Sequence, residues 1–392
     1  MKELATELDR LRGENLLRTR TLLSSAQQIE PVINGHKVLS FCSNDYLGLA
    51  NHPRVIDAYV HAAKRFGVGS GASHLITGHH ESHHALEEEL SEFLGCERTL
   101  LFSTGYMANL GLISALTDRE TCLFEDRLNH ASLIDAAVLA RARLKRYAHR
   151  DTHALAQALK AAGEADKFIA SDGVFSMDGT VAPVDALQDL AQAHDARLVL
   201  DDAHGIGVLG AQGKGCTEGR HAVDTVLVGT LGKAFGVFGA FVGARTEVIE
   251  WCVQRARSYI YTTALPASVA EAARTALHLI IEEAWRRETL REHVEYFRDC
   301  ATQTGIPLTD SETPIQPVVL GEATAALKVS RELLDEGLLV QAIRPPTVPK
   351  DQARLRITFC ATHNRTHIDR LVECLARSCA ESAARPQPAV GD

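Results

Sequence analysis

One lysine of the sequence, Lys233, lies among apolar and glycine residues rather than among polar ones. Its neighbours along the chain include Leu231, Phe235 and Phe238. An amine in such surroundings loses hydration, and this loss disfavours its charged form. A neutral amine is a nucleophile that can form a Schiff base with a carbonyl, as lysines do with pyridoxal phosphate. The alternative, a solvated loop lysine, stays open on this stretch alone.

A carboxylate, Asp201, directly follows the apolar run 198–200, which is typical of a buried strand. An unpaired carboxylate at the end of such a strand would be costly, so we expect a cationic partner. A pyridinium nitrogen is such a partner, because an ionised Asp keeps the ring protonated and able to withdraw electrons from a substrate carbon. The alternative is a helix N-cap, a position at which Asp is common.

Further polar groups follow the predicted strands. Residues 103–109 join a strand to a helix, whose first backbone N–H groups could hold a phosphate. His130 could stack on a planar cofactor, although a loop histidine with ordinary partners is the alternative. Ser176 and His204 could donate to a phenolic oxygen, and Thr230 could reach a phosphate. Together these groups favour a ligand-binding site more strongly than each does alone, because all of them fall at one edge of one predicted sheet.

A histidine-rich segment, residues 78–84, offers a rival chemistry. His80, Glu81 and His84 match the His-Glu-x-x-His pattern in which two histidines bind zinc and the glutamate activates water. The match directly follows a glycine-rich loop, and the sequence shows no obvious third ligand downstream. We therefore expect loop and cap residues and no metal ligands here, and we expect His83 to lie near the cofactor.

Alternation of short apolar runs with helical spacing predicts the element that positions these groups. It indicates an α/β fold with a mainly parallel central sheet covered by helices on both faces. Ligands of such sheets bind beyond the carboxyl ends of the strands. The predicted strands lie at residues 100–102, 122–124, 168–170, 198–200 and 226–228.

The rest of the chain divides into an arm and a second domain. Apolar residues at helical spacing over residues 3–24 predict an amphipathic helix within an N-terminal arm, residues 1–40. A large domain, residues 41–275, begins with a helix over 53–66 and a glycine-rich loop over 67–78. A smaller C-terminal α+β domain follows at residues 276–392.

Composition excludes several classes of protein. Of the 392 residues, 45% are hydrophobic and 23% are charged, which is typical of globular proteins, and no long uncharged run could cross a membrane. A formal net charge of −9 argues against a nucleic-acid partner. Nine dispersed cysteines and the absence of a signal peptide favour reduced thiols and a cytoplasmic location.

The sequence resembles the α-oxoamine synthases, fold-type-I pyridoxal-phosphate enzymes, over nearly its whole length. The resemblance rests on six motifs in the family's order, at residues 43–49, 69–73, 83–87, 172–179, 201–205 and 229–236. It implies pyridoxal 5'-phosphate as the cofactor. Lys233 would carry this cofactor, Asp201 would pair with its ring nitrogen, and His130 would stack on its ring. The other cofactor-binding positions that it implies are Gly105, Tyr106, Ser176, His204, Thr230, Thr262 and Thr263.

The resemblance also bears on partners and substrates. Thr262 and Thr263 are similar to residues that a second subunit lends, which implies a homodimer with shared active sites. Residues 342–349 and 43–46 resemble those members that join L-alanine to a pimeloyl thioester of coenzyme A or a carrier protein in biotin synthesis. Members that use glycine or serine remain alternatives. His74 departs from the pattern, because several relatives have arginine there. The substrate-binding residues implied are Arg18, Asn44, Thr347 and Arg356.

Overall fold

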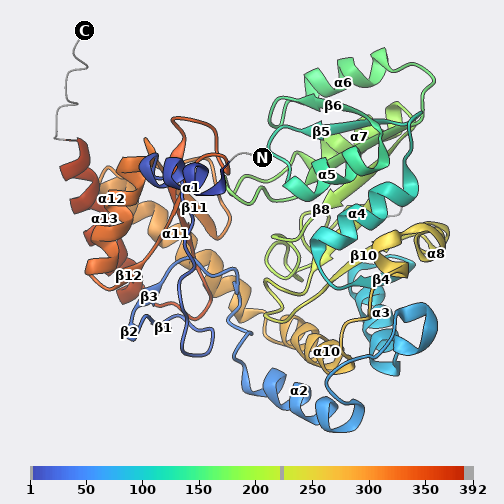
Figure 1. Cartoon of the computed structure of the whole chain (residues 1–392), viewed down its shortest axis with the longest axis horizontal. Coiled ribbons are helices and arrows are strands. Elements are labelled where there is room, and N and C mark those ends of the chain that lie inside the picture. Colours follow the sequence, from blue (N-terminus) through green and yellow to red (C-terminus); the bar gives the residue numbers. More distant parts are fainter. Residues whose placement is uncertain (1–2, 221–224, 384–392) are drawn as a thin grey trace. The chain divides into compact units, whose positions relative to one another are not determined.

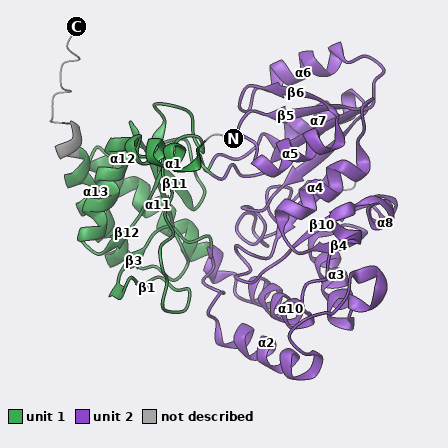
Figure 2. Ribbon diagram, viewed as in Figure 1, with its two compact units in different colours: residues 1–44, 177–179, 288–392 green, residues 45–176, 180–287 purple. Residues whose placement is uncertain are grey.

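The computed structural model describes residues 3–220 and 225–383, and Figure 1 traces their course. These residues form two compact units (Figure 2). Unit 1 combines the described residues up to Asn44 with Met177–Gly179 and with those from Glu288 onward. Unit 2 comprises Asp45–Ser176 and Thr180–Arg287, where residues 221–224 lie outside the description. The domain boundary predicted at residue 275 falls inside a helix of unit 2, α10 (Ala267–Glu282).

Unit 2 is built on a sheet of seven described strands in the order β4-β10-β9-β8-β7-β5-β6. The strands β5 to β9 run parallel, whereas β10 runs antiparallel to both of its neighbours, β9 and β4. This arrangement confirms the predicted mainly parallel sheet. The strands are β4 (Arg98–Phe102), β5 (Cys122–Asp126), β6 (Arg143–Tyr147), β7 (Lys167–Asp172), β8 (Ala196–Asp201), β9 (Thr225–Thr230) and β10 (Ala240–Ala244).

Helices cover both faces of this sheet because its strands carry apolar side chains on both sides. In β5, Leu123 belongs to one buried cluster and its neighbour Phe124 to another. The cluster around Leu123 includes side chains of α4 (Gly105–Leu116), α5 (Ala131–Ala140) and α8 (Thr246–Arg255). The cluster around Phe124 includes side chains of α6 (Thr152–Ala161) and α7 (Val184–Ala193). Near-continuous apolar strands are what such burial requires.

Three more helices of unit 2 pack together: α2 (Pro53–Phe66), α3 (Glu81–Leu94) and α10. The helix predicted over 53–66 is confirmed, and Pro53 begins it in the position that suits proline. The loop predicted over 67–78 instead ends in a π-helical turn, η1 (His74–Gly78). Gly78 permits this turn, because a side chain there would clash with the backbone of Ala72. A four-residue helix, α9 (Arg257–Ile260), precedes α10.

Unit 1 contains an antiparallel sheet in the order β11-β14-β13. Rings of Phe41, Phe297, Phe359 and His363 pack together in its core, where Phe41 stacks on His363 with 4.5 Å between ring centroids. Its elements are α1 (Leu4–Gly13), β1 (Val32–Ile33), β2 (His36–Lys37), β3 (Leu39–Ser40), α11 (Trp285–Gln303), β11 (Ile315–Gly321), α12 (Ala323–Asp335), β12 (Leu338–Leu339), β13 (Gln341–Ile343), β14 (Ala353–Thr358) and α13 (Arg365–Ala383), and the first residues of α11, up to Arg287, belong to unit 2.

The amphipathic helix predicted over residues 3–24 is wrong beyond its first half. The helix α1 ends at Gly13, and Asn15 adopts a left-handed conformation that stops it. The N–H groups of Leu16 and Leu17 both donate to the carbonyl of Leu11, so the chain turns back there.

None of the helices in the described ranges combines the length and apolar character that a membrane span needs. All nine cysteines lie in the described part of the chain and are free thiols.

Candidate active site

The carboxyl ends of neighbouring strands in unit 2 carry the predicted chemical groups. Asp201 is the last residue of β8 and Thr230 the last of β9. Lys233 lies three residues beyond β9, and His130 forms the N-cap of α5, which follows β5. Because the strands are parallel, their carboxyl ends meet at one edge, where ligands of α/β sheets bind.

A tight turn holds the half-buried Lys233. The N–H of Leu231 donates to Gly239 O at 2.9 Å, and that of Gly236 donates to Lys233 O at 2.8 Å. Gly236 has a positive φ of 68°, and a side chain there would clash with the backbone next to Ala50. Glycine is therefore needed in this turn. The predicted apolar surroundings hold for Leu231 and Phe235, which are buried, whereas Phe238 is half-exposed.

Asp201 is 7% exposed, and its hydrogen bonds come from neutral groups. Asn109 Nδ2 donates to Oδ2 at 2.6 Å, and the N–H of Ala203 donates to Oδ1 at 3.1 Å. No helix begins at Asp201 in the described chain, so the N-cap alternative is wrong. A buried carboxylate with neutral hydrogen-bond partners can accept a cationic one as well. A pyridinium nitrogen therefore fits this position.

His130 lies in the same electrostatic environment as Asp201 and Lys233. Burial lowers the pKa of His130, while the charge of Asp201 acts to raise it and that of Lys233 to lower it. Its Nδ1 forms a 2.7 Å hydrogen bond with Ser132 Oγ, which fixes the ring. Its backbone N–H donates to Asp172 Oδ2 at 3.1 Å. An imidazole held in this way keeps one orientation at the sheet edge.

Asp172 is a site residue that sequence reasoning missed. It is 3% exposed at the end of β7, and burial, with Asp201 next in importance, raises its pKa well above the ordinary value. A protonated Asp172 would avoid placing a second negative charge beside Asp201. Its place two residues after a predicted strand, at the start of the motif 172–179, was the available signal.

His204 is buried, and Tyr46 holds its ring. The hydroxyl of Tyr46 lies 2.8 Å from Nδ1 of His204, and both side chains are more than nine-tenths buried. A tyrosine hydroxyl can donate to Nδ1 or accept from it, so this contact fixes the orientation of the ring. Tyr46 belongs to the motif 43–49, but the sequence alone does not indicate that it contacts His204. Ser176 lies in unit 2 four residues beyond β7.

The first turn of α4 offers backbone donors for a phosphate. Thr104 caps the helix, because its Oγ1 accepts from the N–H of Met107 at 3.2 Å. Nothing lies within 4 Å of the position that a side chain on Gly105 would occupy. The first N–H groups of a helix point outward without partners inside it, so they suit an anion. The ring of Tyr106 lies edge-on to that of His130, 6.5 Å between centroids.

Thr262 and Thr263 lie in the segment between α9 and α10. Thr262 is half-buried and Thr263 is exposed. Two hydrogen bonds fasten the residues that follow, from Ala264 N to Ala72 O at 3.0 Å and from Ser70 Oγ to Leu265 O at 2.7 Å. The structure places these threonines on the surface of unit 2 rather than at the ends of its sheet strands.

The predicted substrate residues lie in unit 1 as two pairs. Both terminal nitrogens of Arg356 donate to Asn44 Oδ1 at 3.2 Å, and Arg356 is buried in β14. Arg18 Nη2 donates to Thr347 Oγ1 at 3.0 Å. Sequence reasoning missed Arg344, whose pKa is lowered first by burial and then by the charge of Arg18. The guanidinium of Arg344 donates to the carbonyl of Asn15, which fixes a second positive charge in this part of unit 1.

The two histidines of the His-Glu-x-x-His motif do not lie in one candidate metal site. His80 is the N-cap of α3, and its N–H donates to Nδ1 of His83 at 2.9 Å. Within the described residues, His84 belongs to a group that could hold a metal ion, but His80 belongs to none. The Nε2 atom of the buried His83 lies 2.7 Å from Leu265 O, so this ring fastens the segment that follows Thr263.

Comparison with known proteins decides the family. The family model of aminotransferase class I and II matches residues 36–375. The 8-amino-7-oxononanoate synthase of Thioalkalivibrio sulfidiphilus (strain HL-EbGR7) is 52% identical over 383 residues, which cover 96% of this chain and 97% of that protein. The chain is an α-oxoamine synthase of the aminotransferase class I and II family. The protein of the same name from Methylococcus capsulatus is also 52% identical, over 97% of this chain and 99% of its own.

Solved structures agree with this membership of the α-oxoamine synthases. The Sphingomonas wittichii serine palmitoyltransferase is similar with a TM-score of 0.92 and 29% identity, covering 98% of both chains. The 8-amino-7-oxononanoate synthase of Francisella tularensis has a TM-score of 0.76 and 29% identity, covering 88% of this chain and 99% of its own. The fold is that of fold-type-I enzymes, and the cofactor of this α-oxoamine synthase is pyridoxal phosphate.

Proposed function

We propose that the chain joins L-alanine to a pimeloyl thioester, with loss of carbon dioxide and release of the thiol, to give 8-amino-7-oxononanoate for biotin synthesis. The observation that carries this proposal is the 52% identity, over nearly the whole of both chains, to proteins named 8-amino-7-oxononanoate synthase. Identity of this order over 96% of the chain supports the same reaction for this protein. The motifs at 43–46 and 342–349 favour the same substrates.

Lys233 and Asp201 would serve the reaction at the sheet edge of unit 2. Pyridoxal phosphate, when bound, withdraws electrons from the α-carbon of the amino acid. Asp201 would maintain that capacity through the ring nitrogen, because its buried carboxylate favours a cationic partner. Nζ of Lys233 would carry the cofactor and, once released, remove the α-proton of alanine. His130 would lie against the ring, and Ser176 and His204 at its phenolic oxygen.

Arg356 would hold the carboxylate of alanine. Its guanidinium is buried, and Asn44 Oδ1 accepts from both terminal nitrogens, which restricts its orientation. A guanidinium fixed in this way can donate two parallel hydrogen bonds to a carboxylate. Holding the carboxylate selects the bond of the α-carbon that breaks, because it sets how the amino acid is turned.

Arg18 and Thr347 would contact the far end of the acyl chain. A pimeloyl group ends in a carboxylate, and Arg344 adds a second positive charge near Arg18. Two guanidinium groups in this part of unit 1 would favour such an acid over an acyl chain with an apolar end. The thioester could arrive on coenzyme A or on a carrier protein, since both present the same carbonyl.

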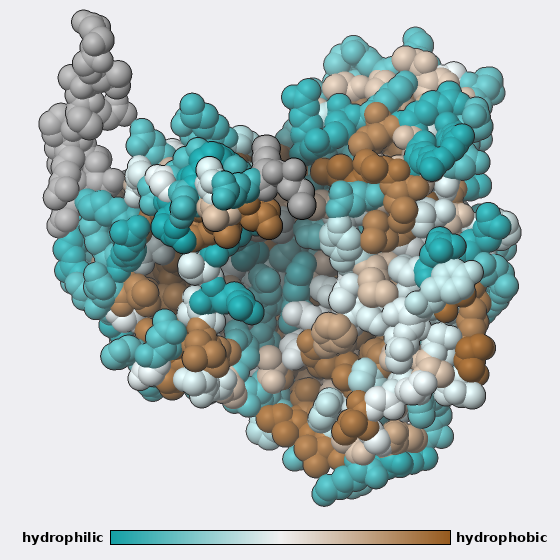
Figure 3. Space-filling view, viewed as in Figure 1, coloured by the Kyte–Doolittle hydropathy of each residue, from teal (hydrophilic) through white to brown (hydrophobic). Residues whose placement is uncertain are grey.

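A homodimer with shared active sites forms part of the proposal. Ile56, Tyr59 and Val60 are each at least 40% exposed and lie on one face of α2, where apolar surface gathers at the foot of the view (Figure 3). A second copy that covers this surface would remove it from water. Thr262 and Thr263, on the surface of unit 2, would then contact the cofactor of the partner subunit.

The cytoplasmic location also stays a prediction.

An activity assay with a panel of substrates tests the proposed reaction. The purified enzyme receives alanine, glycine or serine in combination with a pimeloyl, acetyl, succinyl or palmitoyl thioester. We expect the highest kcat/KM for alanine with pimeloyl, measured as thiol release. The similarity to serine palmitoyltransferase makes serine with palmitoyl the second candidate pair. A preference for that pair, or for glycine, would contradict the proposed substrates.

A further inference from the structure

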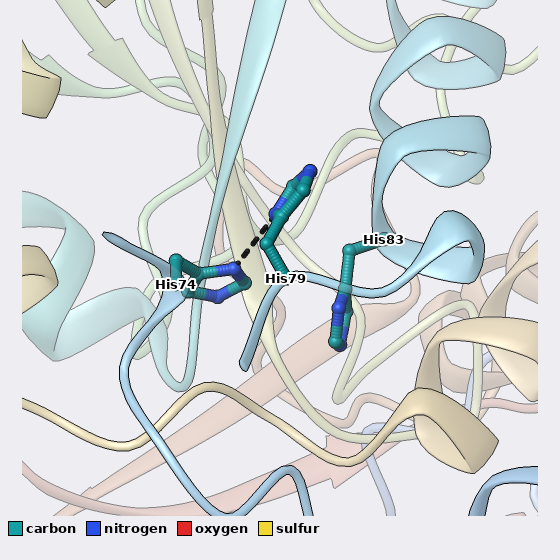
Figure 4. A group of neighbouring side chains, drawn as sticks. All are labelled: His74, His79 and His83. Carbon is teal, nitrogen blue, oxygen red and sulfur yellow. Dashed lines mark hydrogen bonds between the residues drawn. The ribbon is translucent and has the colours of Figure 1, made fainter. Parts of the chain in front are cut away.

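Three histidines that the proposed reaction does not use converge in unit 2 (Figure 4). His74 begins η1, His79 follows it, and His83 lies in the first turn of α3. The distances between ring centroids are 5.2 Å for His74 and His79, 5.0 Å for His74 and His83, and 5.7 Å for His79 and His83. One ligand atom of each residue lies within 4.8 Å of those of the other two.

These distances are close to those of a metal site with three imidazole ligands. Zn–N bonds of about 2.0–2.1 Å at the tetrahedral angle place two ligand nitrogens about 3.3 Å apart and two ring centres about 5 Å apart. The Nδ1 atoms of His74 and His79 are 3.0 Å apart and share one proton. A metal ion could take the place of this shared proton and bind both Nδ1 atoms. Each of the two rings would then carry its remaining proton on Nε2. We propose that His74, His79 and His83 bind a divalent transition-metal ion of the zinc class.

The surroundings orient one of the three rings, that of His83, as a metal ligand requires. Histidines that bind metals usually direct their other N–H to a carbonyl or a carboxylate. Nε2 of His83 donates to Leu265 O at 2.7 Å, which leaves the lone pair on Nδ1. A metal ion at Nδ1 would replace the N–H of His80, which donates to it now. Nε2 of His79 lies 4.0 Å from a carboxylate oxygen of Glu87.

The site is enclosed on one side and open on the other. His83 is fully buried, and His74 stacks on Tyr259 with 5.0 Å between ring centroids and 9° between ring planes. The side chain of His79 is 29% exposed, so an ion could enter past it. Imidazole ligands favour Zn²⁺, Co²⁺, Ni²⁺ and Cu²⁺ over Mg²⁺ and Ca²⁺. Three protein ligands leave a fourth position for water.

A second arrangement shares His79 and must be distinguished from the first. His79, His84 and Glu87 also bring three ligand atoms within 4.8 Å of one another. The side chain of His84 is 62% exposed, and Glu87 Oε1 already accepts from the N–H of Leu101 at 2.9 Å. The first arrangement is favoured because two of its three rings are buried and held by neighbours.

An ion in this site would brace the segment that carries Thr262 and Thr263. Tyr259 stacks on His74 at the start of this segment, and Leu265 O accepts from His83 at its end. Ordering the histidines would therefore restrict both ends of the segment. The binding itself does not depend on the proposed reaction, because it can be measured with no substrate present.

Zn²⁺ titration of the cofactor-loaded chain, prepared without a polyhistidine tag, tests the proposal. Two variants are compared. His79→Ala removes the most exposed of the three ligands, and His84→Ala, which removes an exposed histidine outside the proposed group, is the matched control. We expect saturable binding of one Zn²⁺ per chain, unchanged in His84→Ala. In His79→Ala, Zn²⁺ binding should weaken by more than the roughly 10- to 100-fold that loss of a ligand's hydrogen-bond partner costs.

Co²⁺ provides a second measurement that does not require the variants to fold equally well. The wild-type chain with Co²⁺ should give the strong visible absorption of a tetrahedral site, and Zn²⁺ should displace it, whereas Mg²⁺ should not. Three results would each overturn the proposal: no saturable Zn²⁺ binding by the wild type, undiminished binding by His79→Ala, or loss of binding in His84→Ala. The last would place the ion with His84 and Glu87.

Discussion

At the scale of single residues, the chemistry depends on how burial sets charge. Asp201 is ionisable and buried, yet its hydrogen-bond donors are neutral, and Asn109 holds one of its oxygens. Asp172 lies in the same environment, and burial favours its protonated form. Because burial favours the protonated form of Asp172, a cationic ring can pair with Asp201 without a second negative charge beside it.

Replacing Asp201 by its uncharged isostere tests whether the reaction needs the negative charge of this side chain. In Asp201→Asn, the side chain still fills the same volume, but it would no longer stabilise the protonated ring nitrogen that we propose as its partner. We expect kcat to fall by about 10²–10³, as loss of one well-placed electrostatic group typically does, with little change in the urea midpoint of unfolding. Asp189→Asn, on the exposed surface of α7, is the matched control and should keep full activity. Wild-type kcat in Asp201→Asn would contradict the role of this charge.

At the scale of elements, the turn after β9 determines where the lysine lies. Gly236 adopts a left-handed conformation directly beside the backbone of Ala50. Alanine at this position would therefore suffer both backbone strain and a steric clash, and the clash involves backbone that cannot rotate away.

The variant Gly236→Ala should lose bound cofactor and at least about 2 kcal/mol of unfolding free energy, which is more than left-handed strain alone costs. Gly95→Ala is the control, because Gly95 has a similar φ of 73° at the end of α3 but nothing within 4 Å of an added side chain. It should lose about 1 kcal/mol and retain the cofactor. Urea unfolding and cofactor absorbance measure both effects. Equal losses in the two variants would show that the clash is unimportant.

Much of the sheet and its functional edge could be predicted, because both depend on local patterns. Apolar runs followed by polar residues marked β5, β7, β8 and β9. The strand β6 was missed, since its side chains are mostly exposed and charged at the sheet's edge. The helix over residues 3–24 was overextended, because amphipathic spacing does not reveal the left-handed turn at Asn15.

The residues that sequence reasoning missed share one property: their partners are distant in the chain. Tyr46 contacts His204, which lies 158 residues away, and Arg344 lies near Arg18 from the opposite end of the sequence. No spacing along the sequence encodes such contacts, which depend on tertiary packing.

At the scale of the whole molecule, buried histidines make stability depend on pH. His363 of unit 1 is almost fully buried, and its Nδ1 accepts from the N–H of Cys360 at 2.9 Å. Burial lowers the pKa of His363 to about 4, below the value near 6.5 in an unfolded chain. The stability that it contributes is therefore complete above about pH 6.5 and is lost as the pH falls toward 4.

Unfolding by urea at several pH values checks this dependence. Between about pH 7 and pH 5, the contribution of His363 should fall by about 2 kcal/mol. His363→Gln should lower the stability at neutral pH but make it less dependent on pH. His153→Gln, at an exposed position on α6, should leave the dependence unchanged. A pH dependence in His363→Gln as steep as that of the wild type would rule out this histidine as a cause.

The most direct test of the central claim locates the cofactor on the chain. The enzyme is treated with borohydride, which makes a Schiff base permanent, and its peptides are then mapped by mass. We expect the pyridoxyl group on Lys233 alone, and Lys233→Ala should show neither the adduct nor turnover, whereas Lys214→Ala should show both. A pyridoxyl group on another lysine, or an active Lys233→Ala enzyme, would contradict the account.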